Sequence, residues 1–245
     1  MHYRHWTAVA WLLGAATVSP PMLHGQQPLD QAARDAKLRL FSTNNLHNIG
    51  VALLKYHDAH RSYPARANFD REEKPLLSWR VHLLPGLDLK SLHQEFRLDE
   101  AWDSEQNRRL VARMPDVYRS PTSRAPPGRT TYLGVCGDGL MFHGSSPRSM
   151  EDIRDGTSYT IAVLEVDDDR SVPWTKPDDW QFDAHRPLAG LGKSHSGGFP
   201  ALFLDSSTRF IPPTVDPALF RKLLTVAGGE DVRDRIPLFG GQERW

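Results

Sequence analysis

The sequence is organised around residues 29–63, LDQAARDAKLRLFSTNNLHNIGVALLKYHDAHRSY, the longest segment with a helical hydrophobic period. Six of its residues recur at steps of three and four and share one helical stripe: Leu38, Ser42, Leu46, Ile49, Leu53 and Tyr56. Charged and amide side chains lie largely off this stripe, which predicts one buried face and one wet face. Asp30 is the expected N-cap, and Ser62 with Pro64 supplies the expected stop. A helix of roughly thirty residues reaches about 45 Å, so we expect other elements to lie along it.

The segments that follow this helix read as several short helices. Residues 75–89 are dense in apolar side chains, and Ser78 is well placed to cap a helix there. Residues 91–100 and 103–114 continue the pattern, the latter with Asp103 as its expected cap.

Beyond Val117 the pattern changes to short apolar runs between proline and glycine turns. The predicted strands are residues 130–136, 159–166, 199–204 and 209–212, the last two forming a hairpin around a turn at 205–208. A final short helix is expected after Asp216. Helices first and strands later predict an α+β fold, in which a long N-terminal helix packs on an antiparallel β-sheet with several short helices.

Charge and the chain's ends limit the functional classes. Lys plus Arg total 30 and Asp plus Glu total 30, so no net field favours nucleic acid. The apolar run from Thr7 to Val18 follows a basic start, which predicts a signal peptide or an uncleaved N-terminal anchor over residues 1–25. The remaining divisions are one domain over 29–235 and a tail over 236–245. The lone Cys136 cannot form an intramolecular disulfide.

Six phrases occur in order along the chain: NNLHNIGVALLKYHDAHRSYP, KPLLSWRVHLLPGL, LDEAWDSEQNRRLVARMPDVYRSP, DIRDGTSYTIAVLEV, VPWTKPDD and HSGGFPALFLDSSTRF. Together they resemble the DUF1559 family of planctomycete exported proteins, from about Gln31 to Val232. Members of that family look like the G-type pseudopilins of type II secretion. The resemblance implies a pseudopilin-like head and protein partners in the cell envelope or the secretion machinery.

The chain departs from the family pattern in three places. The family's C-terminal signature, a histidine followed after nine residues by Asp-Gly, corresponds to His195 and Asp205, with Ser206 in place of the glycine. Ser120-Pro121-Thr122 stands where the family often has Cys-Pro-Ser. A signal-like segment replaces the prepilin leader and its membrane helix, which puts insertion into a filament through that helix in doubt.

His195 and Asp205 have two interpretations. A base oriented by a carboxylate is a common acid–base arrangement, and it would make the protein a periplasmic hydrolase. However, no G-x-S-x-G elbow accompanies the pair. A structural role fits the same residues, because Gly197 and Gly198 allow close backbone approach and Asp205 can hold the turn. We favour the structural role.

A calcium- or glycan-binding module is a further alternative. Asp167, Asp168 and Asp169 offer oxygen ligands for calcium, and G-type pseudopilins can carry that ion, but no EF-hand spacing is present. The tryptophans could form a sugar-stacking surface, although core packing is the commoner role of such side chains.

The favoured hypothesis is an exported, non-enzymatic structural or interaction protein of the periplasm or cell envelope, without a cofactor or bound nucleic acid. It contacts the membrane only if residues 1–25 remain uncleaved. The positions expected to set the shape of the head, in addition to His195, Gly197, Gly198 and Asp205, are Asn44, Asn45, Trp79, Asp155 and Gly156.

Overall fold

A single long helix crosses the molecule. The computed structural model describes residues 26–229, so the predicted N-terminal segment and the C-terminal tail lie outside the described part. Helix α1 runs without interruption from Gln26 to His60, about 52 Å at 1.5 Å per residue. The predicted helix is therefore confirmed. The Asp30 cap is wrong, because the helix begins before that residue. At the other end Arg61 takes a left-handed φ of 61° and stops the helix.

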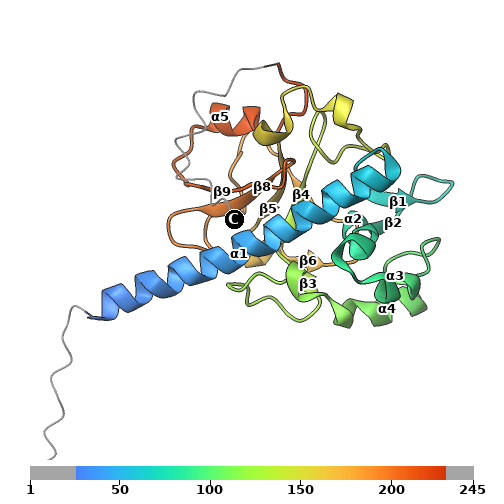
Figure 1. Cartoon of the computed structure of the whole chain (residues 1–245), viewed down its shortest axis with the longest axis horizontal. Coiled ribbons are helices and arrows are strands. Elements are labelled where there is room, and N and C mark those ends of the chain that lie inside the picture. Colours follow the sequence, from blue (N-terminus) through green and yellow to red (C-terminus); the bar gives the residue numbers. More distant parts are fainter. Residues whose placement is uncertain (1–25, 230–245) are drawn as a thin grey trace, which may run out of the picture.

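The main sheet has five strands in the order β7-β4-β5-β8-β9. Figure 1 shows β4, β5, β8 and β9 beside α1. Their bounds are Tyr132–Cys136 for β4, Ile161–Glu165 for β5, Trp180–Gln181 for β7, Phe199–Phe203 for β8 and Thr208–Ile211 for β9. The pairs β4–β5, β5–β8 and β8–β9 are antiparallel, as predicted, whereas β4–β7 is parallel. The parallel pair arises because the chain leaves β5, makes a long loop and returns beside β4.

Two small antiparallel sheets were not predicted. Strand β1, Ala67–Phe69, pairs with β2, Pro75–Ser78, and β3, Arg129–Thr130, pairs with β6, Val172–Pro173. These strands have two to four residues each, too few for a period-2 pattern to stand out in a sequence.

The short helices α2 to α4 lie together to one side of the sheet, and α5 lies apart from them (Figure 1). The α-helices are α2 Trp79–His82, α3 Lys90–Gln94, α4 Glu105–Leu110 and α5 Pro217–Lys222. The 3₁₀ turns are η1 Leu84–Leu87, η2 Val111–Arg113, η3 Asp116–Tyr118, η4 Met150–Asp152, η5 Thr157–Tyr159 and η6 Asp168–Arg170. Ser78 and Asp216 cap α2 and α5 as predicted, but α4 is capped by Ser104 and not by Asp103.

The sheet is buried on both faces. Alternate residues of β4 divide between two apolar clusters, with Tyr132 on the α1 side and Leu133 on the opposite side. The α1 side contains the helical stripe around Leu46 and Ile49, and the opposite side is covered by α5 through Phe220. This arrangement explains why β5 reads as a nearly continuous apolar run.

Helix α1 touches the β8–β9 turn directly at Gly50. A Cβ on Gly50 would lie 2.9 Å from Ser206 Cα and 2.7 Å from Leu202 Cδ1, so only glycine fits. His47 Nδ1 lies 3.0 Å from the Ser206 carbonyl oxygen one turn earlier. Ser206 itself adopts a left-handed φ of 66°, a conformation that glycine takes without strain. The serine therefore occupies a turn position that the DUF1559-like pattern fills with glycine.

Within residues 26–229, no helix combines the length and the apolar character that a bilayer span requires.

Candidate functional site

A cluster of polar side chains lies beneath α1, where the helix crosses the sheet. We call it the Glu165 cluster; its members are Ser42, Ser120, Thr122, Tyr132, Glu165 and His195. Its carboxylate comes from the last residue of β5 and is 1% exposed. A charge in that position must be fully hydrogen-bonded, because an unpaired buried carboxylate costs several kcal/mol.

Both oxygens of Glu165 have two partners. Ser42 Oγ donates to Oε2, which also faces His195 Nε2 at 3.0 Å. Ser120 Oγ and Thr122 Oγ1 donate to Oε1 across 2.5 and 3.0 Å. Because an ionised carboxylate can only accept, Nε2 is the nitrogen of His195 that carries the hydrogen of this pair. The carboxylate is thus saturated by groups of the protein itself.

Tyr132 and Asn45 extend the cluster toward the next segment of the chain. Tyr132 Oη lies 2.9 Å from Ser42 Oγ, and Asn45 Nδ2 lies 3.5 Å from the same phenol oxygen. Asn45 also donates to the Arg119 carbonyl oxygen across 3.0 Å. Burial raises the pKa of Tyr132, and the charge of Glu165 raises it further, so the phenol stays neutral. The cluster therefore joins α1 to β4, β5 and the segment after η3.

His195 and Asp205 do not form the pair that the hydrolase alternative requires. They lie before and after β8, whose five residues span roughly 16 Å. Asp205 Oδ1 instead accepts from the backbone nitrogen and the hydroxyl of Ser207, at 2.9 and 2.5 Å, and so holds the hairpin turn. His195 packs edge-on against Phe210, with ring centroids 6.0 Å apart.

The two glycines after His195 differ in their surroundings. Gly198 has a φ of 153°, and a Cβ there would lie 2.1 Å from the Ile211 carbonyl oxygen. Gly198 therefore permits close approach of the two backbones beside the histidine. Gly197 has a φ of 86° but open space around the position of a Cβ, so its glycine serves the turn conformation alone.

A second buried charge pair holds the short helices to the sheet. Arg80 Nη2 donates to Asp179 Oδ1 across 2.6 Å, and the two side chains are 0% and 1% exposed. The same oxygen accepts from Trp79 Nε1 at 3.1 Å and from the Gly134 backbone nitrogen at 2.8 Å. Trp79 also stacks on Phe142 with ring centroids 5.1 Å apart, which makes it a core residue.

The other candidate positions lie apart from the Glu165 cluster. Asn44 is exposed on α1. Asp155 accepts from Thr225 Oγ1 at 2.8 Å and from the backbone nitrogens of Gly228 and Gly229 at 2.7 Å each. With Gly156 at a φ of 93°, it ties the turn before β5 to the segment after α5.

The three consecutive aspartates do not converge: Asp167 and Asp169 face Lys193, whereas Asp168 bonds another segment. Asp167 accepts from the Lys193 backbone nitrogen at 2.7 Å. Asp168 accepts from the Arg124 backbone nitrogen at 2.7 Å and from Ser123 Oγ at 2.5 Å. Across the part of the chain that the structure describes, no group of three His, Cys, Asp or Glu side chains converges as a metal site. The calcium alternative thus gains no geometric support there.

The comparisons with known proteins place the N-terminal part of the chain in a family. The family model described as "Protein of unknown function (DUF1559)" matches residues 31–138. Those residues belong to the DUF1559 family. The DUF1559 match includes most of α1 and the short helices α2 to α4, and it ends after β4. It is shorter than the resemblance inferred from the motifs, whose C-terminal phrases lie beyond residue 138. No curated protein matches the chain, and no solved structure does.

Sequence reasoning found His195 but missed Glu165, its partner. Two signals were present. Glu165 is the one charged residue within the apolar run TIAVLEV, and Ser42 is the one small polar side chain on the apolar stripe of α1. A charge and a hydroxyl on surfaces built for burial both require partners, so each points to the other.

Proposed function

We propose that this is an exported, non-enzymatic interaction protein that docks to other proteins of the cell envelope or the secretion machinery through one side of α1. The observation that carries the proposal is an exposed apolar pair on the helix, Leu40 and Phe41. Their exposed fractions are 40% and 50%, unusual for large apolar side chains on a helix whose stripe is otherwise buried. An apolar pair rimmed by polar residues is typical of a protein contact surface.

The pair belongs to a continuous strip, which we call the outer face of α1: Lys37, Leu40, Phe41, Asn44 and Asn48. These residues recur at steps of three and four, so they share a side of the helix away from the buried stripe. Lys37 Nζ lies 5.7 Å from the centroid of the Phe41 ring. Charge is sparse on this strip, and charge-poor surfaces with an aromatic anchor are favoured at interface centres.

The outer face leads into a groove beside the helix. A groove of about 400 Å³ lies between Asn48, Val51 and Lys55 of α1 and two loops, Gly86–Leu89 and Pro115–Val117. Lys55 Nζ donates to the Gly86 carbonyl oxygen across 2.9 Å and closes one wall. The strip and the groove together can receive a helix or an extended segment of a partner laid alongside α1.

The absence of an enzymatic role in this proposal is supported by the Glu165 cluster. Ser42 Oγ donates to the carboxylate and is not hydrogen-bonded to His195, so the hydroxyl and the imidazole do not form a nucleophile–base pair. Every cluster residue except Thr122 is buried, which leaves no approach for a substrate. Export is supported by the sequence of residues 1–25, and the DUF1559 match supports membership of a family that resembles envelope proteins.

Site-specific photo-crosslinking tests the proposal. A benzophenone amino acid at Phe41 or Asn48, in a cell that exports the protein, should yield discrete crosslinked species. The same label at Met150, which is 39% exposed on η4, should not yield them. The double variant Leu40→Ser and Phe41→Ser should abolish the species formed at Asn48, while Leu98→Ser, a change at another exposed apolar residue, should preserve them.

Crosslinks of equal yield at Met150 and Phe41, or none from the outer face, would contradict docking through α1. Crosslinks that appear only in the cytoplasm would contradict the envelope location.

A further inference from the structure

A cavity of about 720 Å³ lies beside the sheet between β6 and β7. We call it the β6–β7 cavity. Its volume is within the range of roughly 300–1,000 Å³ that is usual for small-molecule sites. No residue of α1 lines it, so it is separate from the outer face and from the Glu165 cluster.

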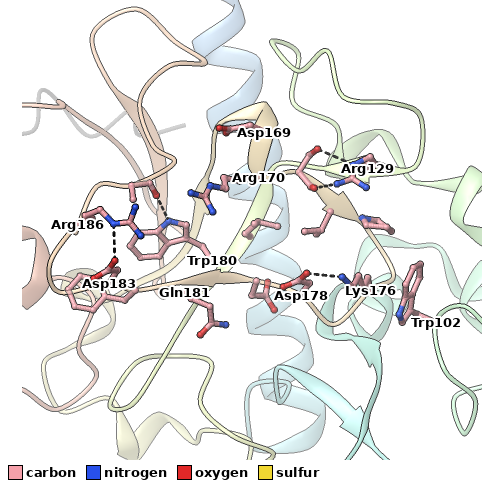
Figure 2. Close-up of a pocket in the computed structure, with 17 residues that line it drawn as sticks. Trp102, Arg129, Asp169, Arg170, Lys176, Asp178, Trp180, Gln181, Asp183 and Arg186 are labelled. Carbon is pink, nitrogen blue, oxygen red and sulfur yellow. Dashed lines mark hydrogen bonds and ion pairs between the residues drawn. The ribbon is translucent and has the colours of Figure 1, made fainter.

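One end of the cavity combines an aromatic ring with an ion pair. Trp180 lies there beside Asp183 and Arg186, as Figure 2 shows. Arg186 Nε donates to Asp183 Oδ2 across 3.1 Å, and Trp180 Nε1 donates to the Ala189 carbonyl oxygen across 3.0 Å. The indole is thereby fixed in orientation, while the carboxylate and guanidinium keep further acceptor and donor positions.

The opposite end repeats this combination. Trp102 lies beside Lys176 and Asp178, on the far side of the cavity from Trp180 in Figure 2. Lys176 Nζ donates to Asp178 Oδ2 across 3.0 Å and stands 6.0 Å from the centroid of the Trp102 ring. Each end therefore places an indole next to paired donors and acceptors. Trp102 is half-buried and can offer its ring to a ligand, whereas Trp180 is 5% exposed and packs in the apolar core. Sugars present the same mixture, since their rings have apolar C–H faces and hydroxyls that both donate and accept.

The cavity is lined by charges of both signs, and two of its arginines stand outside the ion pairs. Besides the two pairs above, Asp169 lies 3.8 Å from Lys193 Nζ, which also lies 3.9 Å from Asp167, and Asp179 is bound by Arg80 at 2.6 Å. Arg129 and Arg170 also line the cavity, and within residues 26–229 neither has a carboxylate in ion-pair contact. A ligand with an acidic group would complement these guanidiniums.

Arg170 is held in position by a glycine. A Cβ on Gly190 would lie 2.8 Å from Arg170 Cγ, and the φ of Gly190 is 80°. The aliphatic stem of the arginine packs against this bare backbone. Its guanidinium lies near Trp180 in Figure 2. Arg170 is an exposed residue, so its guanidinium can be reached by a ligand.

We infer that the β6–β7 cavity binds an acidic oligosaccharide. A sugar ring stacks on Trp102, the hydroxyls of the ligand bond the two ion pairs, and a carboxylate or sulfate group meets Arg170. The volume admits about two or three sugar units. This binding activity goes beyond docking through α1 and does not depend on it.

Isothermal titration of the full-length exported protein with three trisaccharides tests the inference. The probes are trigalacturonate, a sulfated galactan trisaccharide and neutral maltotriose. At least one acidic probe should bind about tenfold more tightly than maltotriose, which corresponds to about 1.4 kcal/mol. Its affinity should fall several-fold between low and high salt, because charge contributes to binding. The stronger acidic probe tells whether the preferred group is a carboxylate or a sulfate ester.

Matched variants locate the site. Arg170→Gln should reduce the affinity for the acidic probe about tenfold without altering the affinity for maltotriose, whereas Arg34→Gln, at an exposed arginine of α1, should change neither. Lys176→Gln should weaken every probe that binds. Circular dichroism and melting temperature establish that each variant is folded.

Three outcomes would overturn the inference. They are failure of all three probes to bind at about 10 mM, equal binding of acidic and neutral probes, and equal affinities of Arg170→Gln and Arg34→Gln. These binding measurements involve no protein partner. A negative result would therefore overturn sugar binding in the cavity without bearing on docking through α1.

Discussion

Replacing Glu165 by glutamine tests whether the buried cluster fastens α1 to the sheet. The amide keeps the shape of the carboxylate but substitutes an NH₂ group for one acceptor oxygen, so two of the four donors lose their acceptor. Each hydrogen bond to a charged group contributes about 1.5–3 kcal/mol. Hydroxyls can turn to accept from the amide, and this relief recovers part of the loss. We therefore expect a destabilisation of about 2–4 kcal/mol, which is less than the full cost of leaving a buried charge without its partner.

Urea unfolding at pH 7, followed by far-UV circular dichroism, measures this change. The matched control is Glu151→Gln, which makes the same chemical change at an exposed glutamate. The control should shift the free energy of unfolding by less than about 0.5 kcal/mol, as surface substitutions usually do. In a thermal melt, Glu165→Gln should lower the melting temperature by roughly 5–15 °C, at about 2–4 °C per kcal/mol for a chain of this size.

A destabilisation of Glu165→Gln no larger than that of the control, with an unchanged urea slope, would refute the reasoning. It would mean that water, and not the protein, satisfies the carboxylate. A large loss with a reduced slope would instead indicate that the native state had loosened.

Three further predictions concern packing and charge. Gly50→Ala should cost about 1–3 kcal/mol in urea unfolding because its Cβ would clash with Ser206, although alanine favours a free helix by about 1 kcal/mol; a stabilised variant would disprove the close contact. Burial lowers the pKa of His82 to about 4, and the charges of His93 and His60 lower it further. The contribution of the neutral side chain to the free energy of unfolding is therefore complete above pH 6.5 and is lost as the pH falls toward 4. Wild type should lose roughly 3 kcal/mol more than His82→Asn over that range, measured by urea unfolding at stepped pH. Asp179→Ala should lower the free energy of unfolding by about 3–5 kcal/mol, because it leaves the buried charge of Arg80 unpaired. Adding Arg80→Met should recover part of that loss, and additive costs of the two changes would contradict the coupling.

The elements that carry their own period were predictable from the sequence. The stripe from Leu38 to Tyr56 specified α1, and the apolar run ending at Glu165 specified a strand buried on both faces. The hairpin of β8 and β9 followed from its turn residues. The parallel position of β7 was not predictable, because two residues have no measurable period and the partner strand lies about forty residues earlier.

The candidate site was predictable only in part. His195 stood out through its motif, and the nearest carboxylate within that motif was Asp205, which gave the wrong partner. The actual partner, Glu165, lies thirty residues earlier in the sequence and is brought near by the β5–β8 pairing. Identifying Glu165 as the partner required the register between β5 and β8, which cannot be read from the local spacing of residues.

The packing of α1 on β8 and β9 has a consequence for the order in which the chain folds. The helix is made early, yet the strands that it covers, β8 and β9, follow its Gly50 by roughly 150 residues. Synthesis proceeds from the N-terminus, so the apolar stripe of the helix is made long before the strands that cover it. The stripe therefore stays uncovered until the β8–β9 hairpin has been made, and that hairpin completes the structure.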